Sequence, residues 1–322
     1  MPVTHPMDQF HQMLANIQNR GAYKGNRTGV GTHFLPNQML TFDMAEGFPA
    51  ITTKKLPFKS ARGEILGMWR GYDNAADFDA IGCPVWYQNA NETPAWLASP
   101  YRRGPGDIGR AYSKQFTDYK DWRSANTQAE ADRLAAAGYT LLAHDASRNT
   151  WIFQRGINQL EECLRTLMTK PEDRRMIVSA WRPDEHDQMA LPACHYSYNL
   201  VTDVENKELH LLVVMRSWDT FLAFNITIGA IWLSVYAKMA GYTPRLMSIV
   251  AADAHVYTNH TEQVNLLLSR DHYPQPQLQL GDSIPVLKSV DEIPGVFARI
   301  QPDDISLVGY QSHPAIKAPM AA

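Results

Sequence analysis

Cysteine is scarce in this chain. Its 322 residues include only Cys83, Cys163 and Cys194, with no Cys-x-x-Cys pair and no cluster of cysteine and histidine at metal-ligand spacing. We therefore expect neither a disulfide framework nor a structural zinc site, and no metal cofactor. A reducing cytoplasm fits this cysteine content best.

Long hydrophobic runs and tracts of one charge are also missing. The longest apolar stretch, residues 226–241, is interrupted by Lys238 and is shorter than the roughly 18 to 20 residues that a membrane span requires. It predicts a buried core helix, and the start of the chain predicts no signal peptide. The 30 basic and 33 acidic residues nearly balance, without a polybasic tract, so neither nucleic acid nor a membrane is an expected partner. A small anionic ligand is compatible with this charge.

What the chain has in quantity is apolar sequence in both helical and strand patterns. Hydrophobic residues make up 45% of the chain, which is enough for a substantial core. Apolar residues at helical spacing predict helices over about 8–20 and 157–168, the second with Cys163 in the core. Strand-like runs follow at residues 176–181, 196–202, 209–215 and 247–250. Because no repeat and no Gly-x-Gly-x-x-Gly fingerprint occurs, the fold class is α+β, with the second and third runs paired antiparallel.

Local signals complete this organisation. Asp8 and Ser60 are candidate N-caps, and Pro36-Asn37 between two β-rich runs predicts a hairpin over residues 31–42. Residues 1–322 are expected to form a single domain, with residues 117–150 as a peripheral insertion that forms a small subdomain. A capping box beginning at Thr127 opens a short helix within this insertion.

Cys194 is a candidate nucleophile. It stands between two predicted strands, beside His195, and a thiolate there could attack an electrophile if a neighbouring cation lowered its pKa. The alternative is an ordinary core cysteine. A thiol hydrolase would need a histidine and an orienting Asn or Asp nearby in space, which the sequence does not locate.

Several arginines stand at the ends of predicted elements. Arg27 lies in a glycine-containing loop, Arg174 and Arg175 precede a strand, and Arg216 and Ser217 follow one. Guanidinium groups and a hydroxyl converging on one point would suit a phosphate monoester. Surface arginines at strand ends are the alternative.

Residues 252–260 are unusually polar for a segment that follows an apolar run. Strand alternation places His255 and Tyr257 on one face, where they could hold sugar hydroxyls. A metal site is the rival, but no carboxylate-rich spacing of two histidines on a helix supports it.

These segments together resemble the thymidylate synthase family over nearly the whole chain. The blocks are N-R-T-G-V-G-T, T-T-K-K with Glu64 ten residues after Lys54, D-R-R-M-I-V-S-A-W, M-A-L-P-A-C-H, R-S-W-D-T-F-L, D-A-H-V-Y-T-N-H and G-Y-Q-S-H-P-A-I-K-A-P. The resemblance implies a thymidylate-synthase-like fold. In it a mixed, mainly antiparallel sheet, flanked by helices, forms the interface of a homodimer.

The resemblance also implies a reaction. Cys194 would add to carbon 6 of a pyrimidine nucleoside monophosphate, so that carbon 5 can attack the methylene group of 5,10-methylenetetrahydrofolate. Glu64 would organise water and relay protons, which suits a carboxylate in a partly buried cleft. Tyr112 and His195 match positions that support the active-site network, although both could instead be packing residues.

The remaining roles follow position by position. The phosphate would be held by Arg27, Arg216 and Ser217, with Arg174 and Arg175 supplied from the other subunit of the homodimer. The sugar would contact His255 and Tyr257. On the folate side stand Lys54, Trp86, Asp219, which is also in the catalytic set, and Ala321.

The base-recognition segment departs from the family pattern. Matching Phe-Asn selects Asn225 as the residue that reads the base, whereas an ungapped count from Arg216 selects Thr227. Asn199 stands where a glutamine is usual. An Asn amide can donate and accept, which suits uracil, and no Asp lies here to select cytosine. This favours dUMP over dCMP.

The product depends on whether hydride or water reaches the exocyclic methylene. Excluding water requires a closed lid. Retention of Trp86 and of the tail 316–319 favours reductive methylation of dUMP to dTMP. The residues after Trp86 and the terminal Ala321-Ala322 keep alternatives open: 5-hydroxymethylation of dUMP or dCMP, or methylation of dCMP, as in phages with modified DNA. A non-catalytic nucleotide- or RNA-binding homologue is a further class, against which the retained Cys194 and Glu64 argue.

Overall fold

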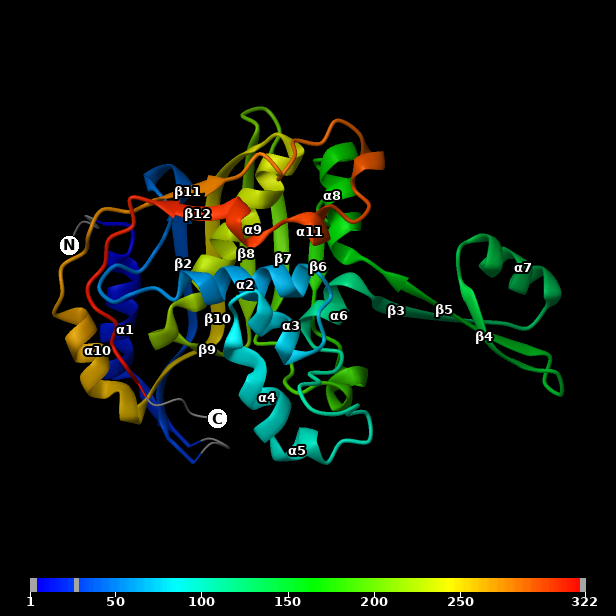
Figure 1. Ribbon diagram of the computed structural model, residues 1–322, viewed down its shortest axis with the longest axis horizontal. Helices are drawn as coiled ribbons and strands as arrows, with labels where there is room; N and C mark the ends of the chain where they lie inside the picture. The colour runs from blue at the N-terminus through cyan, green and yellow to red at the C-terminus, as the bar shows by residue number, and fades with distance from the viewer. Residues whose placement is uncertain (1–4, 26–28, 319–322) are drawn as a thin grey trace.

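A seven-stranded sheet forms the centre of the molecule (Figure 1). The computed structural model describes residues 5–25 and 29–318, so Arg27 and Ala321 lie outside the described residues. The strand order is β1-β2-β10-β8-β7-β6, with β9 beside β10; β10 runs parallel to β8 and β9, and the other pairs are antiparallel. The strands are β1 (Ala22–Lys24), β2 (Thr32–Asp43), β6 (Ile177–Ser179), β7 (His195–Asp203), β8 (Glu208–Met215), β9 (Trp218–Asp219) and β10 (Thr243–Tyr257). The expected α+β class with a mixed, mainly antiparallel sheet is confirmed.

The predicted hairpin at Pro36-Asn37 is wrong. Residues 32–43 form one strand, β2, which pairs with β10 on both sides of Asn37, with Pro36 opposite Asp253 and Gln38 opposite Ala251. Asn37 adopts a positive φ of 54° but does not reverse the chain. The long partner β10 therefore overrides a local turn signal, since strand formation depends on tertiary pairing more than on intrinsic preference.

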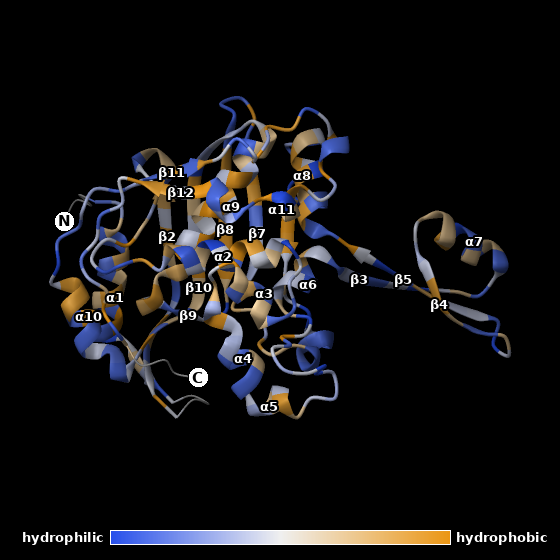
Figure 2. Cartoon of the chain, in the orientation of Figure 1, coloured by the Kyte–Doolittle hydropathy of each residue, from blue (hydrophilic) through white to orange (hydrophobic). Residues whose placement is uncertain are grey.

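Helices cover one face of this sheet. They are α1 (Asp8–Arg20), α2 (Phe58–Trp69), α8 (Gln159–Thr169) and α9 (Phe224–Ala240). α9 is buried almost throughout, as expected, and its Trp232 stacks on Tyr198 of β7 with ring centroids 3.9 Å apart. Figure 2 shows apolar sequence concentrated where α9 and the sheet meet. No helix among the described residues is long and apolar enough to cross a membrane.

Two of the predicted helix starts are displaced. Asp8 is the first residue of α1 rather than its cap, and Ser60 lies inside α2, which begins at Phe58. Pro57 precedes that helix, where a missing N–H costs no hydrogen bond. The smaller elements around this core are α3 (Ala75–Ala80), α4 (Tyr87–Glu92), α5 (Pro94–Leu97), α6 (Tyr112–Thr117), α10 (Thr261–Leu268), α11 (Val296–Arg299), β11 (Gln277–Leu280) and β12 (Ile305–Val308).

The opposite face of the sheet keeps apolar side chains at the surface. Buried and half-buried residues alternate along β8, as expected where only one face of a strand meets a core. On the other face Met39, Ile177, Val201 and Leu246 are 58%, 46%, 59% and 38% exposed. This face, which we call the open face, runs across the sheet from β2 to β6.

Residues 119–157, which we call the arm, extend away from the body (Figure 1). They form a second sheet, with strand order β3-β5-β4, and one helix with its own small apolar cluster. The elements are β3 (Tyr119–Ala125), α7 (Gln128–Ala136), β4 (Thr140–Asp145) and β5 (Thr150–Ile157). Thr127 caps α7, accepting the Glu130 N–H at 3.3 Å as the capping box predicts. The division into one domain with an insertion at 117–150 stays a prediction, and β5 carries the arm's sheet on to Ile157.

Candidate active site

Cys194 lies immediately before β7, and Arg216, the residue after the end of β8, lies beside it. The Arg216 N–H donates to the Cys194 carbonyl at 2.8 Å, and the guanidinium donates to the carbonyls of Ala193 and Pro192 at 3.0 and 2.9 Å. One guanidinium nitrogen then lies 3.6 Å from the Cys194 sulfur. A cation beside a sulfur favours the nucleophilic thiolate. Arg216 is therefore the neighbouring cation that the sequence alone did not locate for Cys194.

Tyr112 and His195 support the same cysteine. The Tyr112 hydroxyl accepts the Cys194 N–H at 2.5 Å, and its ring stacks on His195 with centroids 4.3 Å apart. His195 Nδ1 lies 2.7 Å from the Tyr198 hydroxyl, and burial lowers the pKa of His195 to about 3. The imidazole is therefore neutral near pH 7. Trp86 closes the group, its ring tilted edge-on to Tyr112.

Glu64 places a neutral carboxyl beside this group. It lies on α2 with 8% of its surface exposed, and burial raises its pKa to about 8. Burial is the main cause of the high pKa of Tyr112, followed by Cys194; Glu64 raises it further, which puts Glu64 and Tyr112 within electrostatic reach. A carboxyl whose pKa is close to the working pH can both give and take a proton.

A second group gathers Lys54 and Asp219. The Lys54 ammonium lies 4.1 Å from the centre of the Phe221 ring, and burial lowers its pKa to about 8 against the opposing charge of Asp219. Burial raises the pKa of Asp219, while His255, His260 and Lys54 oppose that shift. The short strand β9 sets Asp219 opposite His255 on β10, and Arg216-Ser217 directly precede it, so the two groups are neighbours.

His255 and Tyr257 share a face, as alternation predicted. Their rings meet edge to face with centroids 5.5 Å apart, and His255 Nδ1 lies 3.0 Å from an Asp253 carboxylate oxygen. Lys24 pairs with the same carboxylate at 2.8 Å. The polar segment is not a junction after a short strand, however, because β10 continues through Tyr257.

The two candidates for base recognition differ in accessibility. Both lie in the first turns of α9, after Ala223 with its positive φ of 55°. Thr227 is 1% exposed, and its hydroxyl has no hydrogen-bond partner among the described residues. Asn225 is half-buried. Of the two, Asn225 is the more accessible to a ligand.

Asn199, Arg174 and Arg175 are not brought to Cys194 within one chain. Asn199 lies five residues after Cys194, which is about 16 Å along the strand. Its amide donates to the Ser197 hydroxyl and the Leu212 carbonyl. Met176 bonds to Leu200, so the two arginines before it lie at least about 20 Å along the sheet from Cys194. Arg175 is exposed and pairs with Asp173 at 2.6 Å.

The comparisons with known proteins agree with the resemblance. The thymidylate synthase family model matches residues 8–322. The chain belongs to the thymidylate synthase family. A thymidylate synthase from Bordetella parapertussis is 41% identical over 98% of this chain and 100% of its own length. Thymidylate synthases from Pseudomonas syringae pv. tomato and Pseudomonas putida are each 38% identical over the same shares.

Two residues that contact the candidate site residues were not singled out from sequence. The Phe221 ring lies under the Lys54 ammonium, and the Tyr198 hydroxyl is hydrogen-bonded to His195 Nδ1. Strand alternation would place Tyr198, three residues after His195, on the other face, and the irregular pairing between His195 and Ser197 is what the sequence did not signal. The partnership of Phe221 with Lys54 joins residues far apart in the chain and has no local signal.

Proposed function

We propose that this chain is a thymidylate synthase, which transfers the one-carbon group of 5,10-methylenetetrahydrofolate to dUMP and reduces it, giving dTMP and dihydrofolate. The observation that carries the proposal is the Arg216 guanidinium 3.6 Å from the Cys194 sulfur, in a chain that belongs to this family over residues 8–322. The relatives compared are named thymidylate synthase, which does not favour a hydroxymethylase or a dCMP-specific enzyme.

Cys194 opens the reaction as the nucleophile. Its sulfur bonds to carbon 6 of the uracil ring, and the displaced electron pair of the 5,6 double bond makes carbon 5 nucleophilic. Carbon 5 then bonds to the folate methylene as one of the two bonds from that methylene to folate nitrogens breaks, and carbon 5 must then lose its proton. Glu64, neutral near pH 7 and able to exchange a proton with ordered water, is assigned to this relay. Loss of that proton breaks the remaining bond between the methylene and a folate nitrogen, which leaves an exocyclic methylene group on the ring. Hydride from tetrahydrofolate then adds to this group, and the 5,6 double bond re-forms as the Cys194 sulfur leaves, giving dTMP and dihydrofolate.

The phosphate is assigned to Arg216 and Ser217, with Arg27 from outside the described residues. Arg174 and Arg175 lie too far along the sheet to reach the same phosphate within one chain. We therefore assign them to the site of a second subunit, in a homodimer formed through the open face. Its exposed apolar side chains support this interface.

The other ligand contacts are assigned by position and accessibility. Asn225 is assigned to hydrogen bonds with the edge of the uracil ring, because Thr227 is buried and the Asn199 amide already donates to groups within the sheet. His255 and Tyr257 hold the sugar. Lys54, Asp219 and Trp86 line the folate side, together with Ala321 beyond the described residues. A cytoplasmic location is supported by the low cysteine content of the chain.

The test is incubation of the purified protein with methylenetetrahydrofolate and either dUMP or dCMP, following dihydrofolate absorbance and the mass of the nucleotide product. We expect dTMP and equimolar dihydrofolate from dUMP alone, and none from a Cys194→Ser variant. A hydroxymethylated nucleotide without dihydrofolate would instead establish a hydroxymethylase, and product from Cys194→Ser would remove the assigned nucleophile.

A further inference from the structure

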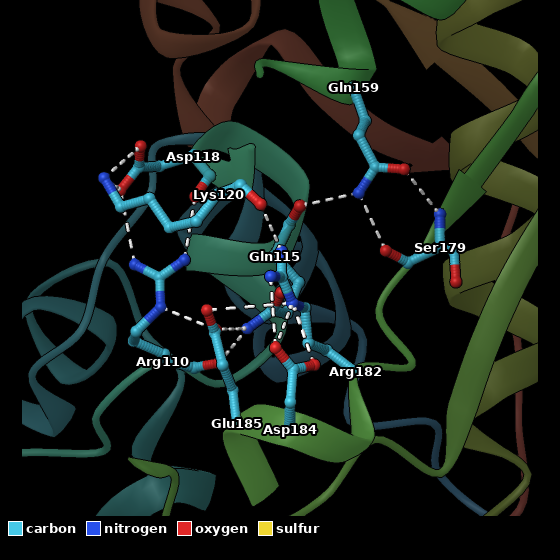
Figure 3. Close-up of polar contacts among 9 residues, drawn as sticks. All are labelled: Arg110, Gln115, Asp118, Lys120, Gln159, Ser179, Arg182, Asp184 and Glu185. Atoms are coloured by element: carbon cyan, nitrogen blue, oxygen red, sulfur yellow. Dashed lines mark hydrogen bonds and ion pairs between the residues drawn. The ribbon is translucent and has the colours of Figure 1, made fainter. Parts of the chain in front are cut away.

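A buried charge network lies where the arm joins the body (Figure 3). Its centre is Glu185, 5% exposed, on the 3-10 segment Pro183–Gln188. One carboxylate oxygen accepts the Arg110 Nε–H at 2.6 Å and the Gln115 amide at 2.7 Å. Arg182 lies 3.8 Å from the other oxygen. None of these residues belongs to the site described above.

The Arg110–Glu185 pair joins the two segments that carry Tyr112 and Cys194. Arg110 stands two residues before Tyr112, and Glu185 stands nine residues before Cys194. Between them the segments are bonded as a short ribbon. The Arg110 N–H donates to the Gln188 carbonyl at 2.8 Å, the Ala190 N–H to the Ile108 carbonyl at 3.1 Å, and Gly109 bridges Met189.

This ribbon leads directly to the nucleophile. Just beyond it the Tyr112 hydroxyl accepts the Cys194 N–H at 2.5 Å, the contact that fixes the backbone from which the sulfur projects. A slip between the two segments would move Tyr112 relative to Cys194. The buried ion pair resists such a slip, because separating it would leave an uncompensated charge in a poorly hydrated place.

The arm is fastened to the same guanidinium from the other side. Arg110 also pairs with the Asp118 carboxylate at 3.3 Å and donates to the Asp118 carbonyl at 2.8 Å. Arg182 donates to the Lys120 carbonyl at 2.5 Å and lies 4.4 Å from the centre of the Tyr119 ring. Two carboxylates thus share Arg110, one facing the nucleophile segment and one facing the arm.

We propose that Arg110 and Glu185 are positioning residues that hold Cys194 against Tyr112, while Asp118 serves only to fasten the arm. This inference rests on the proposed role of Cys194 as the nucleophile. The competing possibility is that the whole network is an anchor for the arm, with no effect on the sulfur.

The two carboxylates provide a matched pair of isosteric variants, Glu185→Gln and Asp118→Asn. Each replaces a carboxylate on Arg110 by an amide of the same shape. We expect Glu185→Gln to lower kcat about tenfold or more with a smaller change in the KM for dUMP, since misplacement of a reacting group acts on the chemical step. Asp118→Asn should leave both constants within about twofold, because the ion pair between Arg110 and Asp118 is partly exposed and such pairs contribute little.

Alkylation of Cys194 by iodoacetamide gives a second readout that does not require turnover. Cys83 and Cys163 are 0% and 4% exposed, and burial raises the pKa of both thiols, so Cys194 is the thiol that reacts. The pH profile of its alkylation should shift in Glu185→Gln and stay unchanged in Asp118→Asn. Peptide mass analysis assigns the modified cysteine.

Each outcome decides the proposal. If Glu185→Gln keeps the wild-type alkylation profile and kcat while losing thermal stability like Asp118→Asn, the network is an arm anchor and the proposal is wrong. If Glu185→Gln fails to fold, Arg110→Lys is the second variant, since it keeps the positive charge but loses the forked geometry of the guanidinium. We expect it to shift the pH profile of Cys194 alkylation in the same direction by a smaller amount. Absence of dTMP formation by the wild type would overturn the proposed function, and the alkylation profile would still test the positioning role.

Discussion

At the scale of single residues, Glu64 serves the proposed chemistry at a cost in stability. Its carboxyl has a pKa of about 8 in the folded protein because of burial, against about 4.5 when unfolded. Between these values the folded state binds more protons than the unfolded state, so its contribution to stability is complete below about pH 4.5 and is lost as the pH rises to 8.

Glu64→Gln removes both the proton relay and this pH dependence. We expect kcat to fall by roughly 100-fold or more, the usual contribution of a positioned acid-base group. The melting temperature of the variant relative to wild type should rise between pH 5 and pH 8, because the amide never ionises. A constant difference in melting temperature across that range would contradict the burial-raised pKa.

At the scale of elements, the C-terminal segment docks along the stretch that carries Lys54. The Tyr310 hydroxyl donates to the Ile51 carbonyl at 2.9 Å, and the His313 N–H donates to the Thr52 carbonyl at 2.8 Å. Arg270 donates to the Thr53 carbonyl at 2.8 Å and to the Pro314 carbonyl at 2.9 Å. Three consecutive carbonyls before Lys54 are therefore held from the C-terminal third of the chain.

Arg270→Gln should loosen Lys54 and the C-terminal segment together. Charged hydrogen bonds contribute about 1.5 to 3 kcal/mol, so we expect the KM for methylenetetrahydrofolate to rise about tenfold or more while the KM for dUMP changes little. Arg70→Gln is the control, because Arg70 also joins two segments, donating to the Ile300 carbonyl at 2.6 Å. Equal effects of both variants on the folate KM would show a general loss of stability instead.

The elements also show how far the sequence predicts this fold. The apolar run at 226–241 predicted α9, and alternation predicted the contact between His255 and Tyr257, because both signals are local. The contact of Arg216 with Cys194 depends on the pairing of β7 with β8, and the continuity of β2 depends on β10. These long-range pairings are absent from local patterns, so the family motifs predicted candidate site residues, and the contacts between them come from the structure alone.

At the scale of the whole molecule, a stack of histidines joins the N-terminal segment to the segment after α10. His272 stacks on His5, and the tilted ring of His11 lies against it, with ring centroids 4.2 Å apart in each pair. Burial is the main cause that lowers the pKa of His11 and His272 to about 4, although Asp8 opposes the shift. The unfolded chain therefore binds more protons between about pH 6.5 and 4, and stability is lost as the pH falls through that range.

His272→Phe keeps a ring in the stack and removes one titration. Urea unfolding at pH 7 and pH 5 should show that wild type loses more unfolding free energy on acidification than the variant does. His144→Phe on the arm is the control: His144 also stacks on an aromatic ring, that of Trp151, but it is exposed. If His272→Phe and wild type lose the same free energy, the stack does not sense acid.

Removing the arm tests whether the rest of the chain is active without it. Its apolar cluster, Ala125, Ala131, Tyr139, Trp151 and Phe153, is separate from the main core, and the charge network that fastens it ends at Lys120. Lys120 and Gly156 face each other in the antiparallel pair of β3 and β5, so an Asn-Gly turn can join them after residues 121–155 are removed. We expect this shortened chain to fold and to keep kcat within about twofold, because the network around Arg110 stays intact.

A second truncation that also removes Lys120 and Gly156 takes away the carbonyl that Arg182 holds, and should lower the melting temperature further. Size-exclusion chromatography of both proteins separates two roles for the arm. If the first truncation converts a dimer to a monomer and abolishes activity, the arm belongs to the interface between subunits. If the dimer persists with full activity, the open face of the sheet is sufficient for assembly, and the arm contributes neither to catalysis nor to pairing.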